Sequence, residues 1–130
     1  MANNLTISIS ANYQGNGLNT SNVLNNEIIG VTTNAAPEGV NGYSVPTTSG
    51  GTAIPLGGIS APRYLYIQNL DPTNYVSVLT GVSGTLIARL LGGATPGGDA
   101  MLIPLDPSIT APAFISHTAP CLVNFRVFGT

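Results

Sequence analysis

The chain has 130 residues and only eight charged side chains, five acidic and three arginine, with no lysine. Its charged fraction of 6% is far below the roughly 25% of an ordinary soluble domain. Three arginines are too few for the phosphate-neutralising surface of a nucleic-acid-binding protein, and one histidine with one cysteine cannot complete a zinc site. We therefore expect no cofactor and no nucleic-acid partner.

The length suits a single domain over residues 1–130. The longest apolar runs have about four residues, whereas a membrane-spanning helix needs roughly 18 or more, so no membrane partner is expected. The first residues contain neither a basic region nor an apolar segment, which predicts synthesis in a cytoplasm without a signal peptide. The unpaired Cys121 is ordinary in that compartment.

Residues 1–60 are predicted to form a loop-rich first part of the domain. Leu5, Ile7 and Ile9 alternate with polar residues, the period-two pattern of a half-buried strand. Asn, Thr, Ser and Gly dominate the stretches between the apolar segments. The pattern predicts strands at about 4–11, 26–33 and 52–56, joined by long polar loops at 12–26 and 34–51.

Residues 61–130 are predicted to form a regular series of short strands. Apolar alternation recurs at 64–67, 75–79, 85–90, 101–105 and 121–128. Asp-Pro and Gly-rich segments separate these runs and are typical of turns, and the Gly and Pro residues along the chain disfavour helices. The sequence therefore predicts an all-β fold. The expected architecture is a single antiparallel β-sandwich, jelly-roll or immunoglobulin-like, with about eight short strands.

Acidic and amide side chains gather at the predicted turns. Asn69, Asp71 and Asn74 surround the Asp-Pro turn after residue 70, where such side chains can bond their own backbone, so we expect all three to structure it. Asp71, Asp99 and Asp106 each lie beside a Pro or Gly. Calcium would use such oxygens, but the EF-hand spacing is missing, so turn capping is favoured and no metal site is predicted.

Neither His117 nor Cys121 belongs to a catalytic motif. An acid/base or nucleophilic role requires an oriented partner group, and a neighbour such as Ser116 would point to the opposite face of a strand. Cys121 alternates in phase with Val123 and Phe125, which predicts a buried, unreactive thiol. The sequence predicts a protein that is not an enzyme and has no small-molecule substrate.

One segment resembles a known class of proteins. The run from Tyr64 to Val78, YLYIQNLDPTNYVSV, resembles a strand–turn–strand pattern of small virion-associated structural proteins of tailed bacteriophages. The Pro-Gly-Gly-Asp loop at 96–99 and the apolar strand after it are similar to a second part of that pattern, although paired glycines lengthen the loop here. The likeness extends loosely to residues 54–57. It implies a β-sandwich made in the host bacterial cytoplasm and located in the virion.

The resemblance implies a structural role. The expected function is that of a capsid decoration or cement protein, which binds the major capsid protein or other virion proteins in many copies and stabilises the shell. The alternative is a tail- or fibre-associated module that binds a host receptor or glycan. For that role the five tyrosines, Tyr13, Tyr43, Tyr64, Tyr66 and Tyr75, are candidates for a sugar-stacking platform.

The absence of lysine also bears on assembly. Edge strands of monomeric proteins are commonly guarded by charges, especially lysine, so we expect the edges here to be covered by loops or by neighbouring subunits. This predicts a homo-oligomer, for example a trimer. The residues predicted to lie at such an interface are Tyr43, Ile54, Ile59, Arg63, Arg89 and Arg126.

Overall fold

The computed structural model describes residues 5–15, 18–29, 34–35, 42–93 and 98–130, with side chains from residue 42 onward. The chain divides into two compact units, Met1–Thr33 and Asn34–Thr130. The strands of the first unit pair only with each other, whereas two separate sheets form in the second. The single domain predicted over residues 1–130 stays a prediction.

The first unit contains an antiparallel hairpin of β1 (Leu5–Gly15) and β2 (Leu18–Ile29). Its register runs from Leu5 opposite Ile29 to Gly15 opposite Leu18, with an irregularity between Ile7 and Ile9. The long polar loop predicted over 12–26 is therefore wrong. Polar residues face polar residues along this stretch, such as Gln14 opposite Asn19. The strands here are defined by cross-strand backbone pairing. The sequence of this stretch lacks the apolar alternation from which a strand would be predicted.

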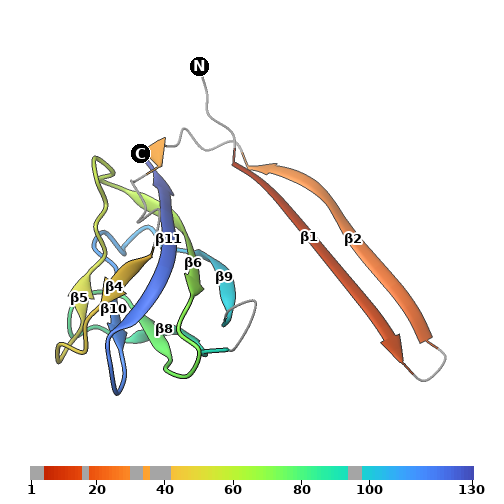
Figure 1. Cartoon of the computed structure of the whole chain (residues 1–130). Coiled ribbons are helices and arrows are strands. Elements are labelled where there is room, and N and C mark those ends of the chain that lie inside the picture. The colour runs from red at the N-terminus through yellow and green to blue at the C-terminus, as the bar shows by residue number, and fades with distance from the viewer. Residues whose placement is uncertain (1–4, 16–17, 30–33, 36–41, 94–97) are drawn as a thin grey trace. The chain divides into compact units, whose positions relative to one another are not determined.

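The second unit is an antiparallel β-sandwich, which confirms the predicted all-β class (Figure 1). One sheet, here called the β10 sheet, has the order β5-β10-β7-β8; the other, the β11 sheet, has the order β3-β11-β6-β9, with β4 also paired to β11. The strands are β3 (Asn34–Ala35), β4 (Tyr43–Val45), β5 (Thr52–Ala53), β6 (Pro62–Asn69), β7 (Val76–Leu79), β8 (Leu86–Leu90), β9 (Ala100–Pro104), β10 (Ala113–Ser116) and β11 (Cys121–Gly129).

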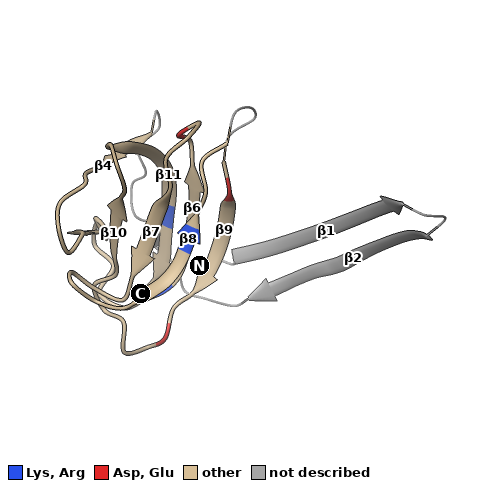
Figure 2. Ribbon diagram, turned by 90° about the horizontal axis from the view of Figure 1, so that it is seen from below, with Lys and Arg blue, Asp and Glu red and all other residues tan. Residues whose placement is uncertain are grey.

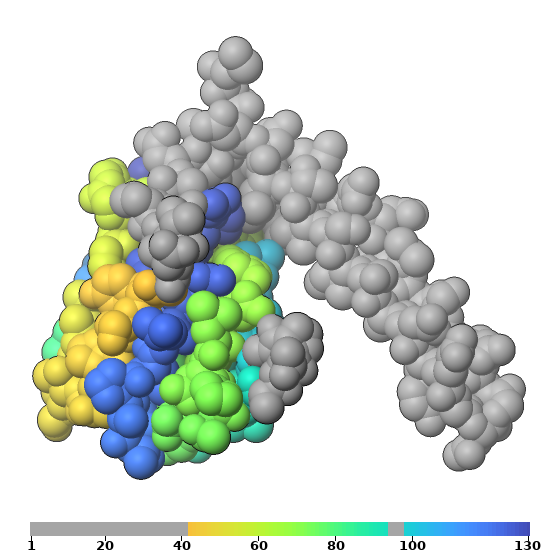
Figure 3. Space-filling model, viewed as in Figure 1, coloured from red at the N-terminus to blue at the C-terminus, as the bar shows by residue number. Residues whose placement is uncertain are grey.

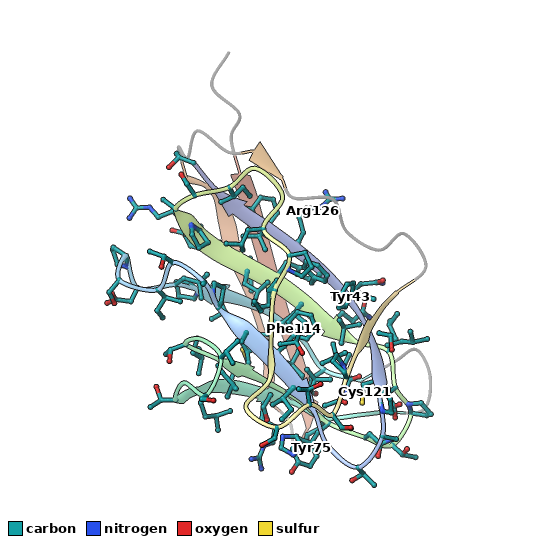
Figure 4. All side chains as sticks on the ribbon, turned by 90° about the vertical axis from the view of Figure 1, so that its left-hand side faces the viewer. Tyr43, Tyr75, Phe114, Cys121 and Arg126 are labelled. Atoms are coloured by element: carbon teal, nitrogen blue, oxygen red, sulfur yellow. The ribbon has the colours of Figure 1, made fainter. Side chains whose placement is uncertain are left out.

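The core lies between the two sheets and follows the alternation of the sequence. Along β11, every second residue from Cys121 to Gly129 is buried, while Leu122 and Arg126 are exposed. Phe114 is fully buried at the centre, and Tyr43 packs edge-on against it with ring centroids 5.4 Å apart. Figure 4 shows both rings inside the sandwich and Arg126 directed away from it. Such edge-to-face pairs add to the stabilisation from burial alone.

Three residues that the sequence placed at an interface contribute instead to this core. Ile54 and Ile59 are only 3% and 4% exposed, and Tyr43 is half-buried between Phe114 and Phe125. Their apolar side chains are already shielded from water within one chain. They are therefore not available to bury apolar surface against a second chain. Within the described residues, no helix is long and apolar enough to span a bilayer.

Candidate functional site

The turn after β6 is organised by a fully buried amide. The Asn69 side chain donates from Nδ2 to the carbonyls of Asn74 at 2.8 Å and Leu90 at 3.2 Å, and its Oδ1 accepts the Asp71 amide at 3.0 Å. The Leu90 contact joins the end of β6 in the β11 sheet to the end of β8 in the β10 sheet. Asn69 therefore connects the two layers as well as the turn.

Asp71 closes the same turn. Its Oδ1 accepts the amides of Thr73 at 2.8 Å and Asn74 at 2.6 Å. These hydrogen bonds favour the ionised carboxylate and hold the pKa of Asp71 below its usual value. The structure thus brings Asn69, Asp71 and Asn74 together in one hydrogen-bonded turn, with Asn74 contributing its backbone amide and carbonyl.

The other loop carboxylates also bond nearby backbone. Asp99 accepts the Leu91 amide at 2.9 Å, and Asp106 accepts the Ser108 amide at 2.8 Å. The hydroxyl and amide of Ser108 hold the pKa of Asp106 below its usual value. Among the described side chains, no three His, Cys, Asp or Glu residues gather in a way that suits a metal ion.

Cys121 is fully buried at the start of β11. Burial, with a smaller contribution from the charge of Asp71, raises the pKa of its thiol to about 11, because the thiolate is disfavoured away from water. Its sulfur lies 3.6 Å from the Ala119 carbonyl. The thiol is therefore protonated at neutral pH and a poor nucleophile.

His117 has a partner that the sequence did not indicate. Ser77 Oγ lies 3.2 Å from His117 Nε2, and the imidazole stacks on Tyr75 with ring centroids 4.2 Å apart. Arg89 lies over the same tyrosine, 4.5 Å from its centroid. The β7–β10 pairing places Ser77 next to Ile115, so residues about 40 apart in sequence meet only through sheet register.

The Ser77–His117 pair belongs to a cluster of four side chains. Ser77 is 2% exposed, and its hydroxyl lies within hydrogen-bond distance of the imidazole edge. Tyr75, in turn, contacts His117 and Arg89 with its ring. The cluster forms a polar cover over the outer side of the β10 sheet.

The outer side of the β11 sheet has a different character. Its residues are those that alternate with the buried positions of β6, β9 and β11: Tyr64, Tyr66, Gln68, Ala100, Leu102, Pro104, Leu122, Asn124, Arg126 and Phe128. We call this set the outer face. Arg126 is its one charged member and lies opposite Tyr66 on β6. Figure 3 looks onto this sheet, where the blue atoms of β11 run between the orange β4 and the green β6.

The outer face exposes apolar side chains. Leu122 is 49% exposed and Tyr66 is 37% exposed. An antiparallel sheet with one solvated side ordinarily carries polar residues there. Tyrosine and arginine are, by contrast, enriched where proteins bind each other. The outer face therefore has the composition of a protein-binding surface.

The three arginines predicted at an interface are spread over both sheets (Figure 2). Arg63 on β6, Arg89 on β8 and Arg126 on β11 are all exposed, whereas the aspartates of the sandwich lie in loops. Arg89 covers Tyr75, and Arg126 belongs to the outer face. The structure does not bring the three into one patch, because Arg89 stands on the β10 sheet and the other two on the β11 sheet.

The tyrosines do not form the single platform considered from the sequence. Tyr43 packs in the core against Phe114 and Phe125, Tyr75 is covered by His117 and Arg89, and the side chain of Tyr13 lies outside the described residues. Tyr64 and Tyr66 share the outer face.

Comparisons of this chain with protein-family models, curated proteins and solved structures found no match.

Proposed function

We propose that this chain is a non-enzymatic structural protein of a tailed-bacteriophage virion, a capsid decoration protein that binds the outer shell through the outer face. The observation that carries the proposal is the exposed aromatic and apolar composition of that face, with Arg126 as its one charged residue. The strand–turn–strand segment from Tyr64 to Val78, which resembles small phage virion proteins, supports the choice of a virion shell as the partner.

A surface with so few charges suits binding in many copies. Desolvating an unpaired charge at an interface is costly, and the outer face contains one charge among ten residues. Shape and backbone complementarity, and not electrostatic steering, would therefore set its specificity. Neutral side chains such as Gln68 and Asn124 supply hydrogen bonds within the same face.

The test measures binding to purified particles that lack the protein. Tyr66→Glu places a charge at the centre of the outer face, and we expect it to weaken binding by at least about tenfold. Leu86→Glu is the matched control because Leu86, 53% exposed, lies on the other sheet. Equal binding by wild type and Tyr66→Glu would overturn the assignment of this face.

Copy number distinguishes the shell from the tail. Band intensities from purified virions should correspond to hundreds of copies for a decoration protein. A handful of copies, together with binding of the purified chain to a glycan array, would replace the proposal with the alternative of a tail- or fibre-associated receptor-binding module. Tyr64 and Tyr66, adjacent on the outer face, would then be the residues to test for sugar stacking.

A further inference from the structure

The edge strands of the sandwich are not equally protected. An edge strand presents unpaired backbone N–H and C=O groups that can add another strand. Strands β3 and β5 have two residues each and β4 has three, which is too short to pair extensively. Strand β8 has an irregular register with β7 and carries the exposed Arg89, and bulges and charges both oppose edge pairing.

Strand β9 lacks these protections. It has five residues, AMLIP, none of them charged, and its register with β6 is continuous from Ala100 to Pro104. It is the last strand of the β11 sheet (Figure 1). Among the described edge strands, β9 is therefore the one that is uncharged, regular in register and long enough to pair.

The hydrogen bonds around β9 show which of its backbone groups face outward. The Leu105 amide donates to Arg63 O at 2.8 Å, and the Asn69 amide donates to Asp99 O at 2.9 Å. In an antiparallel ladder, residues directed at one neighbour alternate with residues directed away from it. Residues 99, 101, 103 and 105 thus direct their backbone groups to β6, and Ala100, Leu102 and Pro104 direct theirs to the side where no described strand pairs with β9.

We propose that β9 pairs antiparallel with β9 of a second copy of this chain, about a two-fold axis at Leu102. In this register Leu102 of each copy exchanges both backbone bonds with Leu102 of the other. The amide of Ala100 donates to the Pro104 carbonyl of the second copy. Pro104 has no N–H, so the Ala100 carbonyl of the second copy receives no hydrogen bond at this end of the strand.

The side chains of β9 favour a second copy of this chain as the pairing partner. Met101 shares the core-facing side of β9 with buried Ile103 but is 43% exposed. The two-fold register sets it opposite Ile103 of the second copy, which covers its exposed part. On the outer side Leu102 meets Leu102, and no like charges face each other across the axis. The inference concerns the free chain in solution and stands whether or not the chain decorates a virion.

Charge pairing at Leu102 tests this geometry. A residue on a two-fold axis faces itself, so Leu102→Lys and Leu102→Glu should each weaken the dimer by about tenfold or more through like-charge repulsion. An equimolar mixture of the two full-length variants should form a heterodimer. Sedimentation velocity and native mass spectrometry report both results. Leu122→Lys, on the same face but on β11, is the control and should sediment as wild type does.

A cysteine trap gives a second measurement. Cα atoms of a hydrogen-bonded antiparallel pair are about 5.5 Å apart, within the range that a disulfide bridges. Leu102→Cys should therefore form a covalent dimer on mild oxidation, and Leu122→Cys should form far less. The proposal is overturned if the wild-type chain sediments as a monomer, if folded Leu102→Lys sediments as wild type does, or if the Lys and Glu chains do not combine.

Discussion

Replacing Asn69 with alanine should remove the contact that joins the two sheets at the turn after β6. The substitution deletes three hydrogen bonds, to the Asn74 and Leu90 carbonyls and from the Asp71 amide. The loss therefore combines missing hydrogen bonds with the desolvation of groups that stay inside the protein.

The size of the stability loss in Asn69→Ala follows from the burial of each hydrogen-bond partner. Leu90 is 0% exposed, so water cannot replace the hydrogen bond that its carbonyl loses, at a cost of about 1–3 kcal/mol. Asp71 and Asn74 are half-buried, so water replaces part of their loss and each contributes roughly 0.5–1 kcal/mol. Together these terms lower the free energy of unfolding by about 2–5 kcal/mol, which corresponds to a fall in Tm of roughly 8–20 °C for a domain of this size.

Urea unfolding measures this effect. The chain has no tryptophan, but Tyr43 packs against Phe114 in the core, so near-UV circular dichroism of tyrosine follows the sandwich. Gln68→Ala is the matched control because Gln68 precedes Asn69 and is half-buried on the outer face; it should change stability by less than about 0.5 kcal/mol. A cost for Asn69→Ala below about 1 kcal/mol would refute the reasoning.

Three further predictions concern the turn, the thiol and the core. The pKa of Asp71 is lowered in the folded protein, so its stabilisation is present above the unfolded pKa and is lost as pH falls through the folded pKa. Asp71→Asn should therefore lower Tm more at pH 7 than at pH 3, and equal shifts at both would contradict the assignment. Cys121, with a pKa of about 11, should resist iodoacetamide at pH 8 until urea unfolds the chain, whereas rapid labelling of the folded protein would show an accessible thiol. Phe114→Ala should cost about 3–5 kcal/mol by urea unfolding and Leu122→Ala, half exposed on the outer face, less than about 1 kcal/mol; similar costs would contradict the placement of Phe114 in the core.

The sandwich could be predicted from the sequence wherever alternation was strong. The pattern at residues 121–128 predicted β11, and Cys121, Val123, Phe125 and Val127 are all buried. The apolar run at 85–90 likewise coincides with β8. By contrast, β10 has only four residues, of which Ala113, Phe114 and Ser116 are buried, so no period of two marks it. Strands covered on both sides lose the alternation that identifies a half-buried strand.

The candidate site was less predictable because long-range register creates it. The turn residues Asn69, Asp71 and Asn74 could be predicted because their hydrogen bonds join residues only a few positions apart. Ser77 and His117 meet through the pairing of β7 with β10, which local spacing does not reveal. Ile54 and Ile59 were placed at an interface for the same reason: their burial depends on strands much later in the chain.

The position of β11 in its sheet has a consequence for the order of folding. This strand pairs with β3, β4 and β6, and it follows all three along the chain. During synthesis, none of these partners can complete its sheet until residues 121–129 have left the ribosome. Folding is slow because long loops must close before these strands can pair. Until β11 has been made, the apolar side chains of β6 stay exposed. Interrupting translation shortly before β11 should therefore yield a nascent chain that binds chaperones, while completing this one strand should release it.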